Sequence, residues 1–106
     1  MYAIAFDLDT GALSQHYPGV SSNNAYAKIR DFLTTKGFGW QQGSVYFGNE
    51  EVNAVDCVLA VQELTQLYAW FAPSVRDIRM LRIEDNNDLS PAIDAALAGH
   101  GAAVAG

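Results

Sequence analysis

The first eight residues carry the pattern that most restricts how this chain can fold. Large apolar side chains alternate there with small or acidic ones: Tyr2, Ile4, Phe6 and Leu8 against Ala3, Ala5 and Asp7. An alternation of period two is typical of a β-strand, so one face of this strand is bulky and apolar. The opposite face is small and ends in the carboxylate of Asp7. A turn is expected to follow at residues 9–11.

Two later segments have apolar residues at the three- and four-residue steps of an amphipathic helix. Before the first lies a Gly-, Pro-, Ser- and Asn-rich stretch, residues 10–24, which we interpret as a loop. Asn23 or Asn24 caps this helix and Gly37 ends it. The second helix is expected to start at residues 50–51. Its apolar positions are Val55, Val58, Leu59, Val61, Leu64 and Leu67.

Extended segments complete the pattern. Residues 38–47 form one bent strand or two short ones, because Gly43 interrupts them. The last strand covers residues 76–84. Its apolar positions change parity between Met80 and Leu81, which indicates a β-bulge or burial on both faces.

The order strand, helix, one or two strands, helix, strand predicts an α+β fold. Two helices on one face of a small antiparallel sheet is the economical packing, so we predict a ferredoxin-like plait (βαββαβ) over residues 1–90. Residues 91–106 are expected to add a short helix, which ends near Leu97, and a flexible Ala/Gly-rich tail. The second face of the sheet has no cover within one chain. We therefore expect a homodimer through that face and the last strand.

The charge of the chain limits its partners. Twelve acidic residues against six Lys and Arg give a net charge of -6 over 106 residues. Such a chain does not capture nucleic acid or a membrane by bulk electrostatics, so RNA binding requires cations that are concentrated locally. The single cysteine excludes an internal disulfide framework. With no apolar run long enough to span a bilayer, we expect a cytoplasmic protein without a membrane partner.

Three blocks of sequence, in this order and spacing, resemble the virulence-associated protein D (VapD) family: residues 1–8 (MYAIAFDL), 42–46 (QGSVY), and 74–79 with 82–84 (SVRDIR and RIE). The resemblance covers residues 1 to about 88. That family is in turn similar to the CRISPR-associated protein 2 nucleases, which share the plait, the dimer and an acidic residue at the end of the first strand. The resemblance implies an endoribonuclease of toxin–antitoxin type that acts on RNA and has a protein antitoxin as partner.

Asp7 is the strongest candidate for catalysis. RNA cleavage needs a base or a metal ion to activate the attacking oxygen. A carboxylate at the end of a strand can be that base or a ligand of Mg²⁺, the one cofactor that we expect; the alternative is a carboxylate that only accepts hydrogen bonds in the turn. Asp9 is interpreted as a turn cap rather than a metal ligand. Ser44 follows Gly43 in extended chain, and its hydroxyl can contact a phosphate oxygen or satisfy a bulge. The resemblance favours the first role, so Ser44 joins Asp7 as a catalytic candidate.

The cations that RNA binding needs are concentrated in the last strand. Arg76, Arg79 and Arg82 make up half of all Lys and Arg in the chain, and guanidinium groups suit bidentate phosphate contacts. In a regular strand Arg76 and Arg82 share one face and Arg79 points to the other. The alternative role of these arginines is ion pairing within the chain. Tyr46 is a candidate for stacking on a base, although aromatic residues in strands more often belong to a core.

Two classes of function remain open on the sequence alone. The three blocks favour an endoribonuclease. The net negative charge favours a non-catalytic dimeric module that binds RNA or a protein.

Overall fold

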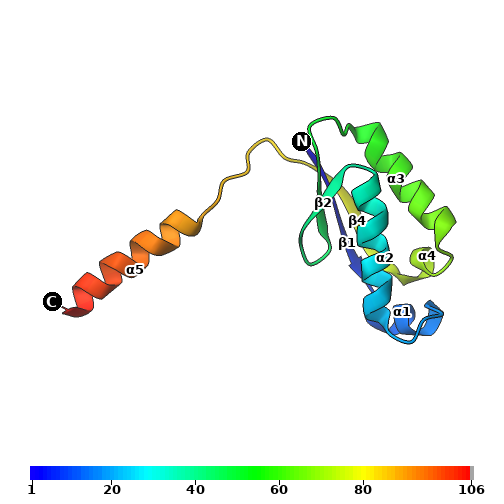
Figure 1. Ribbon diagram of the computed structural model, residues 1–106, viewed down its shortest axis with the longest axis horizontal. Coiled ribbons are helices and arrows are strands. Elements are labelled where there is room, and N and C mark those ends of the chain that lie inside the picture. Colours follow the sequence, from blue (N-terminus) through cyan, green and yellow to red (C-terminus); the bar gives the residue numbers. More distant parts are fainter. Residues whose placement is uncertain (106) are drawn as a thin grey trace.

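The computed structural model describes the backbone of residues 1–105 and the side chains of residues 1–99. Along the chain one strand is followed by two helices, two strands, two helices and a last strand, before a separate helix at the C-terminal end (Figure 1). The elements are β1 (Tyr2–Leu8), α1 (Thr10–His16), α2 (Ser22–Thr35), β2 (Phe38–Gln42), β3 (Val45–Gly48), α3 (Ala54–Leu67), α4 (Phe71–Ser74), β4 (Val75–Arg82) and α5 (Ser90–Ala105).

The four strands form one antiparallel sheet in the order β2-β3-β1-β4. This order is that of a ferredoxin-like plait, so the predicted fold is confirmed. Residues 38–47 form two strands rather than one bent strand, because Gly43 adopts a left-handed conformation (φ 51°) in the turn between them. Strand β1 lies between β3 and β4, which places Asp7 near the middle of one end of the sheet.

The core lies between the sheet and its helices. Ile4 and Phe6 of β1 are buried together with Ile29 of α2 and Leu64 of α3. The ring of Phe6 stacks on Tyr46, with 5.8 Å between the ring centroids. These contacts fix which face of β1 points inward, and Asp7 therefore points to the face that the helices leave uncovered.

The uncovered face combines small and apolar residues with charges. In the register, Ala3 is opposite both Phe47 and Leu81, and Ala5 is opposite Val45. Cross-strand partners share one face of a sheet, so these side chains lie together. Ala5, Val45 and Phe47 are half-buried and Leu81 is 45% exposed.

The stretch interpreted as a loop contains a helix, so that prediction was wrong over residues 10–16. Helix α1 forms because Asp9 caps it and because Leu13 is fully buried. Helix α2 begins two or three residues earlier than expected, since Ser21 is its cap in place of Asn23 or Asn24. Gly37 follows α2 with φ 90°, as the sequence predicts for a helix end.

The second predicted helix, α3, begins later than expected, and its buried face overlaps the predicted one only at Val61 and Leu64. Asn53 and Asp56 form a reciprocal capping box, which starts the helix at Ala54. The buried positions are Cys57, Ala60 and Leu64. Four apolar side chains of the predicted face are instead about half exposed or more: Val55, Val58, Leu59 and Leu67.

Helix α5 starts at Ser90, one residue before its predicted start, and continues past the expected end at Leu97 to Ala105. It lies away from the sheet, after an extended segment over residues 83–89 (Figure 1). Most of the tail that we expect to be flexible, residues 100–106, lies outside the part of the chain with described side chains. Within the described residues, none of the helices has the length and apolar character required to cross a bilayer.

Candidate active site

A β-bulge beside Asp7 shapes the candidate site. Strand β4 pairs Val75 with Leu8 and Asp77 with Asp7, so Arg76 is an extra residue without a partner in β1. Such a bulge redirects the side chain of the extra residue. The parity change between Met80 and Leu81 does not mark this bulge. The register there is regular and puts apolar side chains on both faces, which was the alternative to a bulge at that point.

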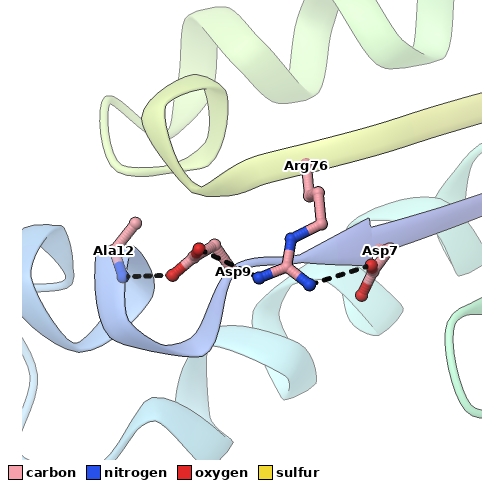
Figure 2. Close-up of polar contacts among 4 residues, drawn as sticks. All are labelled: Asp7, Asp9, Ala12 and Arg76. Atoms are coloured by element: carbon pink, nitrogen blue, oxygen red, sulfur yellow. Dashed lines mark hydrogen bonds and ion pairs between the residues drawn. The ribbon is translucent and has the colours of Figure 1, made fainter.

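The bulge places the guanidinium of Arg76 between two carboxylates (Figure 2). Its Nη1 lies 3.8 Å from Oδ2 of Asp7, and its Nη2 donates a hydrogen bond of 3.1 Å to Oδ2 of Asp9. The side chains of Asp7 and Arg76 are 62% and 63% exposed. A solvent-accessible carboxylate therefore has a guanidinium beside it, at the end of the first strand.

Asp9 has a structural role at this place. The backbone N–H of Ala12 donates a hydrogen bond of 2.8 Å to Oδ1 of Asp9 (Figure 2). That hydrogen bond, and then the one from Arg76, hold the pKa of the Asp9 carboxyl below its ordinary value. The interpretation of Asp9 as a cap is confirmed, whereas Asp7 accepts no hydrogen bond from the first turn of α1.

The arginines of β4 divide between the two faces of the sheet differently from our expectation. Arg79 is opposite Ala5 on the uncovered face, and Arg82 is opposite Tyr2 on the other. The bulge turns Arg76 to the side of Asp7, so Arg76 and Arg79 share a face. Arg76 and Arg82 would share a face only in a regular strand, and the bulge at Arg76 removes that condition.

Each of these arginines is engaged within the chain. Arg79 donates to both oxygens of Asp77, at 3.1 and 3.2 Å, and Nε of Arg82 lies 2.9 Å from a carboxylate oxygen of Glu84. The alternative of intramolecular pairing is thus what the structure shows for β4. An RNA phosphate has to compete with a carboxylate for every one of these arginines.

Ser44 and Tyr46 lie away from the Asp7–Arg76 pair, at a hollow near the same end of the sheet. The carbonyl of Ser44 accepts a hydrogen bond of 3.1 Å from the N–H of Phe6, the residue before Asp7. Both residues line a hollow on the helix side of the sheet, and Arg30 lines it with them. Burial raises the pKa of the Tyr46 phenol, and the guanidinium of Arg30 partly opposes that shift. Tyr46 is 2% exposed and stacks on Phe6, so its ring belongs to the core.

Arg30 had no predicted role. Tyr26 lies one turn before it in α2. Residues four apart in a helix lie on the same side, so this spacing was the available signal. The spacing of Tyr26 and Arg30 indicates a site only once the β2–β3 hairpin is known to pack beside this side of α2.

The described residues around Asp7 do not by themselves form a complete set of Mg²⁺ ligands. Mg²⁺ is held by one or two carboxylates together with substrate phosphates. The two carboxylates that face each other here, Asp7 and Asp77, each have a guanidinium as neighbour. Among the residues with described side chains, no three acidic, His or Cys residues are grouped so as to hold a metal. The Mg²⁺ expectation therefore stays a prediction.

Known proteins resemble this chain over most of its length. The family model of CRISPR associated protein Cas2 matches residues 1–90. Endoribonuclease VapD 2 of Riemerella anatipestifer is 55% identical over 93 residues, which cover 88% of this chain and 99% of the relative. A protein of Helicobacter pylori named endoribonuclease VapD homolog is 53% identical over 97 residues, with 92% and 100% coverage. Endoribonuclease VapD of Dichelobacter nodosus is 43% identical over 96 residues, with 91% and 100% coverage. The chain therefore belongs to the Cas2 family, among its VapD members.

Proposed function

We propose that this chain is an endoribonuclease that cleaves phosphodiester bonds of RNA. One observation carries the proposal. An exposed carboxylate, Asp7, lies beside the guanidinium of Arg76 in a chain whose relatives with near-complete coverage are named endoribonucleases.

The Asp7–Arg76 pair suits a general-base mechanism. The carboxylate of Asp7 accepts the proton of the attacking hydroxyl, whose oxygen forms a bond to phosphorus. The bond from phosphorus to the leaving oxygen breaks, and solvent protonates that oxygen. The guanidinium of Arg76 stabilises the negative charge that develops on the phosphoryl oxygens. No step in this mechanism requires a metal ion.

We further propose that the chain acts as the toxin of a toxin–antitoxin pair in the cytoplasm, with a protein antitoxin as partner. The support is the resemblance of its three sequence blocks to the virulence-associated protein D family. The homodimer belongs to the same proposal. It would cover the apolar part of the sheet face on which Asp7 lies.

The test is RNA cleavage by the purified chain and two matched variants. Asp7→Asn removes a basic oxygen with almost no change in volume, so cleavage is expected to slow by about 10²–10⁴-fold. Asp9→Asn removes the same charge two residues away and keeps a side chain that caps helices well. It loses the oxygen that accepts a hydrogen bond from Arg76 but keeps the candidate base, so it is expected to slow cleavage far less than Asp7→Asn does.

The outcome also decides between the two function classes. Equal cleavage by Asp7→Asn and the unchanged chain would remove Asp7 from the mechanism. If the unchanged chain binds RNA without cleaving it, the non-catalytic module becomes the better description. Cleavage in the presence of EDTA separates the general-base mechanism from one that depends on Mg²⁺, because only the latter is abolished by a chelator.

A further inference from the structure

A hollow of about 510 Å³ lies between α2 and the turn of the β2–β3 hairpin. Its volume is within the range of small-molecule sites, about 300–1,000 Å³. Polar groups converge on it from both elements: Asn23, Tyr26 and Arg30 of α2, and Ser44 and Tyr46 of the hairpin. The combination of a guanidinium, hydroxyl groups and an amide is suited to an anionic, hydrogen-bonding ligand.

The hairpin holds Arg30 in place through an aromatic ring. The guanidinium carbon of Arg30 lies 3.9 Å from the centroid of the Trp40 ring. The indole Nε1 of Trp40 donates a hydrogen bond of 2.8 Å to the carbonyl of Gly43 in the turn. A guanidinium that stacks on a ring keeps the N–H groups at its edge available as donors. Trp40 is thus a positioning residue for Arg30.

Arg30 also differs from the other arginines in charge balance. Every arginine of β4 has a carboxylate within 4.0 Å, and Lys36 pairs with Glu63. None of the ion pairs among residues 1–99 involves Arg30. A phosphate that reaches Arg30 therefore displaces no carboxylate, which gives it an advantage over any position on β4.

From these observations we infer that the hollow binds a phosphate group of single-stranded RNA, with Arg30 and Ser44 as its ligands and Tyr26 against the adjoining nucleoside. This inference rests on the proposed function and names the place where the substrate is held. The N–H of Phe6 donates to the carbonyl of Ser44, so the hollow adjoins the strand end that carries Asp7. The hollow is on the helix side of the sheet and Asp7 is on the uncovered side, so an RNA strand that reaches both has to pass around the end of β1. A single strand is required because its nucleotides can enter a hollow one at a time.

The test measures binding without cleavage. All variants are made in the full-length Asp7→Asn chain, and the probe is a short fluorescein-labelled single-stranded RNA, titrated at a series of NaCl concentrations. Arg30→Gln is expected to weaken binding by about tenfold or more at low salt. It should also reduce the slope of log affinity against log salt by ~0.7, the value for one phosphate contact in a single strand. Ser44→Ala is expected to weaken binding with little change in this slope.

Lys28→Gln is the matched control, since it removes the same charge from α2 outside the hollow, and it should leave affinity and slope unchanged. Thermal melting establishes that each variant is folded. Arg30→Lys should retain most of the slope because it keeps the charge, whatever it loses in affinity.

If Arg30→Gln and Lys28→Gln bind alike while the unchanged chain cleaves RNA, the inference is overturned and the proposed function stands. If the Asp7→Asn chain binds no RNA and the unchanged chain cleaves none, both are overturned.

Discussion

At the scale of the residue, Arg76 connects a structural carboxylate, Asp9, with the candidate catalytic carboxylate, Asp7. As the bulged residue of β4 it contacts Asp9, which starts α1, and Asp7, which has no cap to form. One guanidinium therefore contributes to the structure of the turn and supplies positive charge beside the candidate base. This arrangement needs the bulge, because a regular strand would turn Arg76 to the opposite face.

The capping carboxylate of Asp9 should make the stability of the fold depend on pH in the acid range. The pKa of Asp9 is lowered below 3.8 in the folded chain, so the unfolded chain takes up this proton at a higher pH. The contribution of the ionised group to stability is complete above about pH 4 and is lost as the pH falls through the lowered pKa. Thermal melting over this range should show a steeper loss for the unchanged chain than for Asp9→Asn, which caps α1 without titrating. Parallel curves for the two would contradict the assignment.

At the scale of the element, the β2–β3 hairpin depends on Gly43. Its φ of 51° lies in the left-handed region, and a Cβ added to it would meet no atom within 4 Å. A side chain at this position would therefore clash with no neighbour, and it would destabilise the fold only through the left-handed backbone conformation. Gly43→Ala should lower the free energy of unfolding by about 1 kcal/mol, and Gly43→Asn by less, because Asn tolerates this conformation. Urea denaturation measures both.

Gly39 provides the control in the same hairpin. It lies in β2 without a positive φ, and an added Cβ would approach other atoms only to 3.9 Å. Gly39→Ala should be near neutral in stability, since it also restricts the unfolded chain. A loss equal to that of Gly43→Ala would mean that the hairpin does not depend on the left-handed turn.

The helices and strands also show which parts of the fold can be predicted from the sequence alone. The plait follows from the order of periodic segments, and the C-terminal end of α2 follows from Gly37. Helix α1 was missed because Gly11 suggests a turn, while the capping by Asp9 and the burial of Leu13 against the rest of the fold decide for a helix. The exposed face of α3 was misjudged for a related reason: the small residues Cys57 and Ala60 allow the close approach that buries them.

The candidate site was predictable only in part. The position of Asp7 at the end of β1 follows from the alternation of residues 2–8. The placement of Arg76 beside Asp7 does not follow from the sequence. It depends on a bulge, which turns one residue to the other face of the sheet and leaves no clear sign in the apolar pattern. Arg30 acquires its position from Trp40, ten residues later in another element, and such a contact depends on tertiary packing.

At the scale of the whole molecule, the acidic chain places its few cations against its own carboxylates or against aromatic rings. Lys36 and the three arginines of β4 are paired, and Lys28 lies over the ring of Tyr68 at 5.8 Å. Long-range attraction of RNA is therefore weak, and binding has to come from a local arrangement such as the hollow at Arg30. The same reasoning favours specific capture of single strands over sequence-independent coating of nucleic acid.

The last prediction is the homodimer through the uncovered sheet face. Apolar side chains remain exposed on two sides of the chain, Leu81 on the sheet face and Leu59 on α3, at 45% and 49%. Light scattering at micromolar concentration should give twice the monomer mass for the unchanged chain. Leu81→Glu places a charge in the proposed interface and should yield monomers, whereas Leu59→Glu, the same change on the helix side, should leave the dimer intact. The reverse pattern would place the interface on α3, and Asp7 would then face solvent in both copies rather than another copy of the chain.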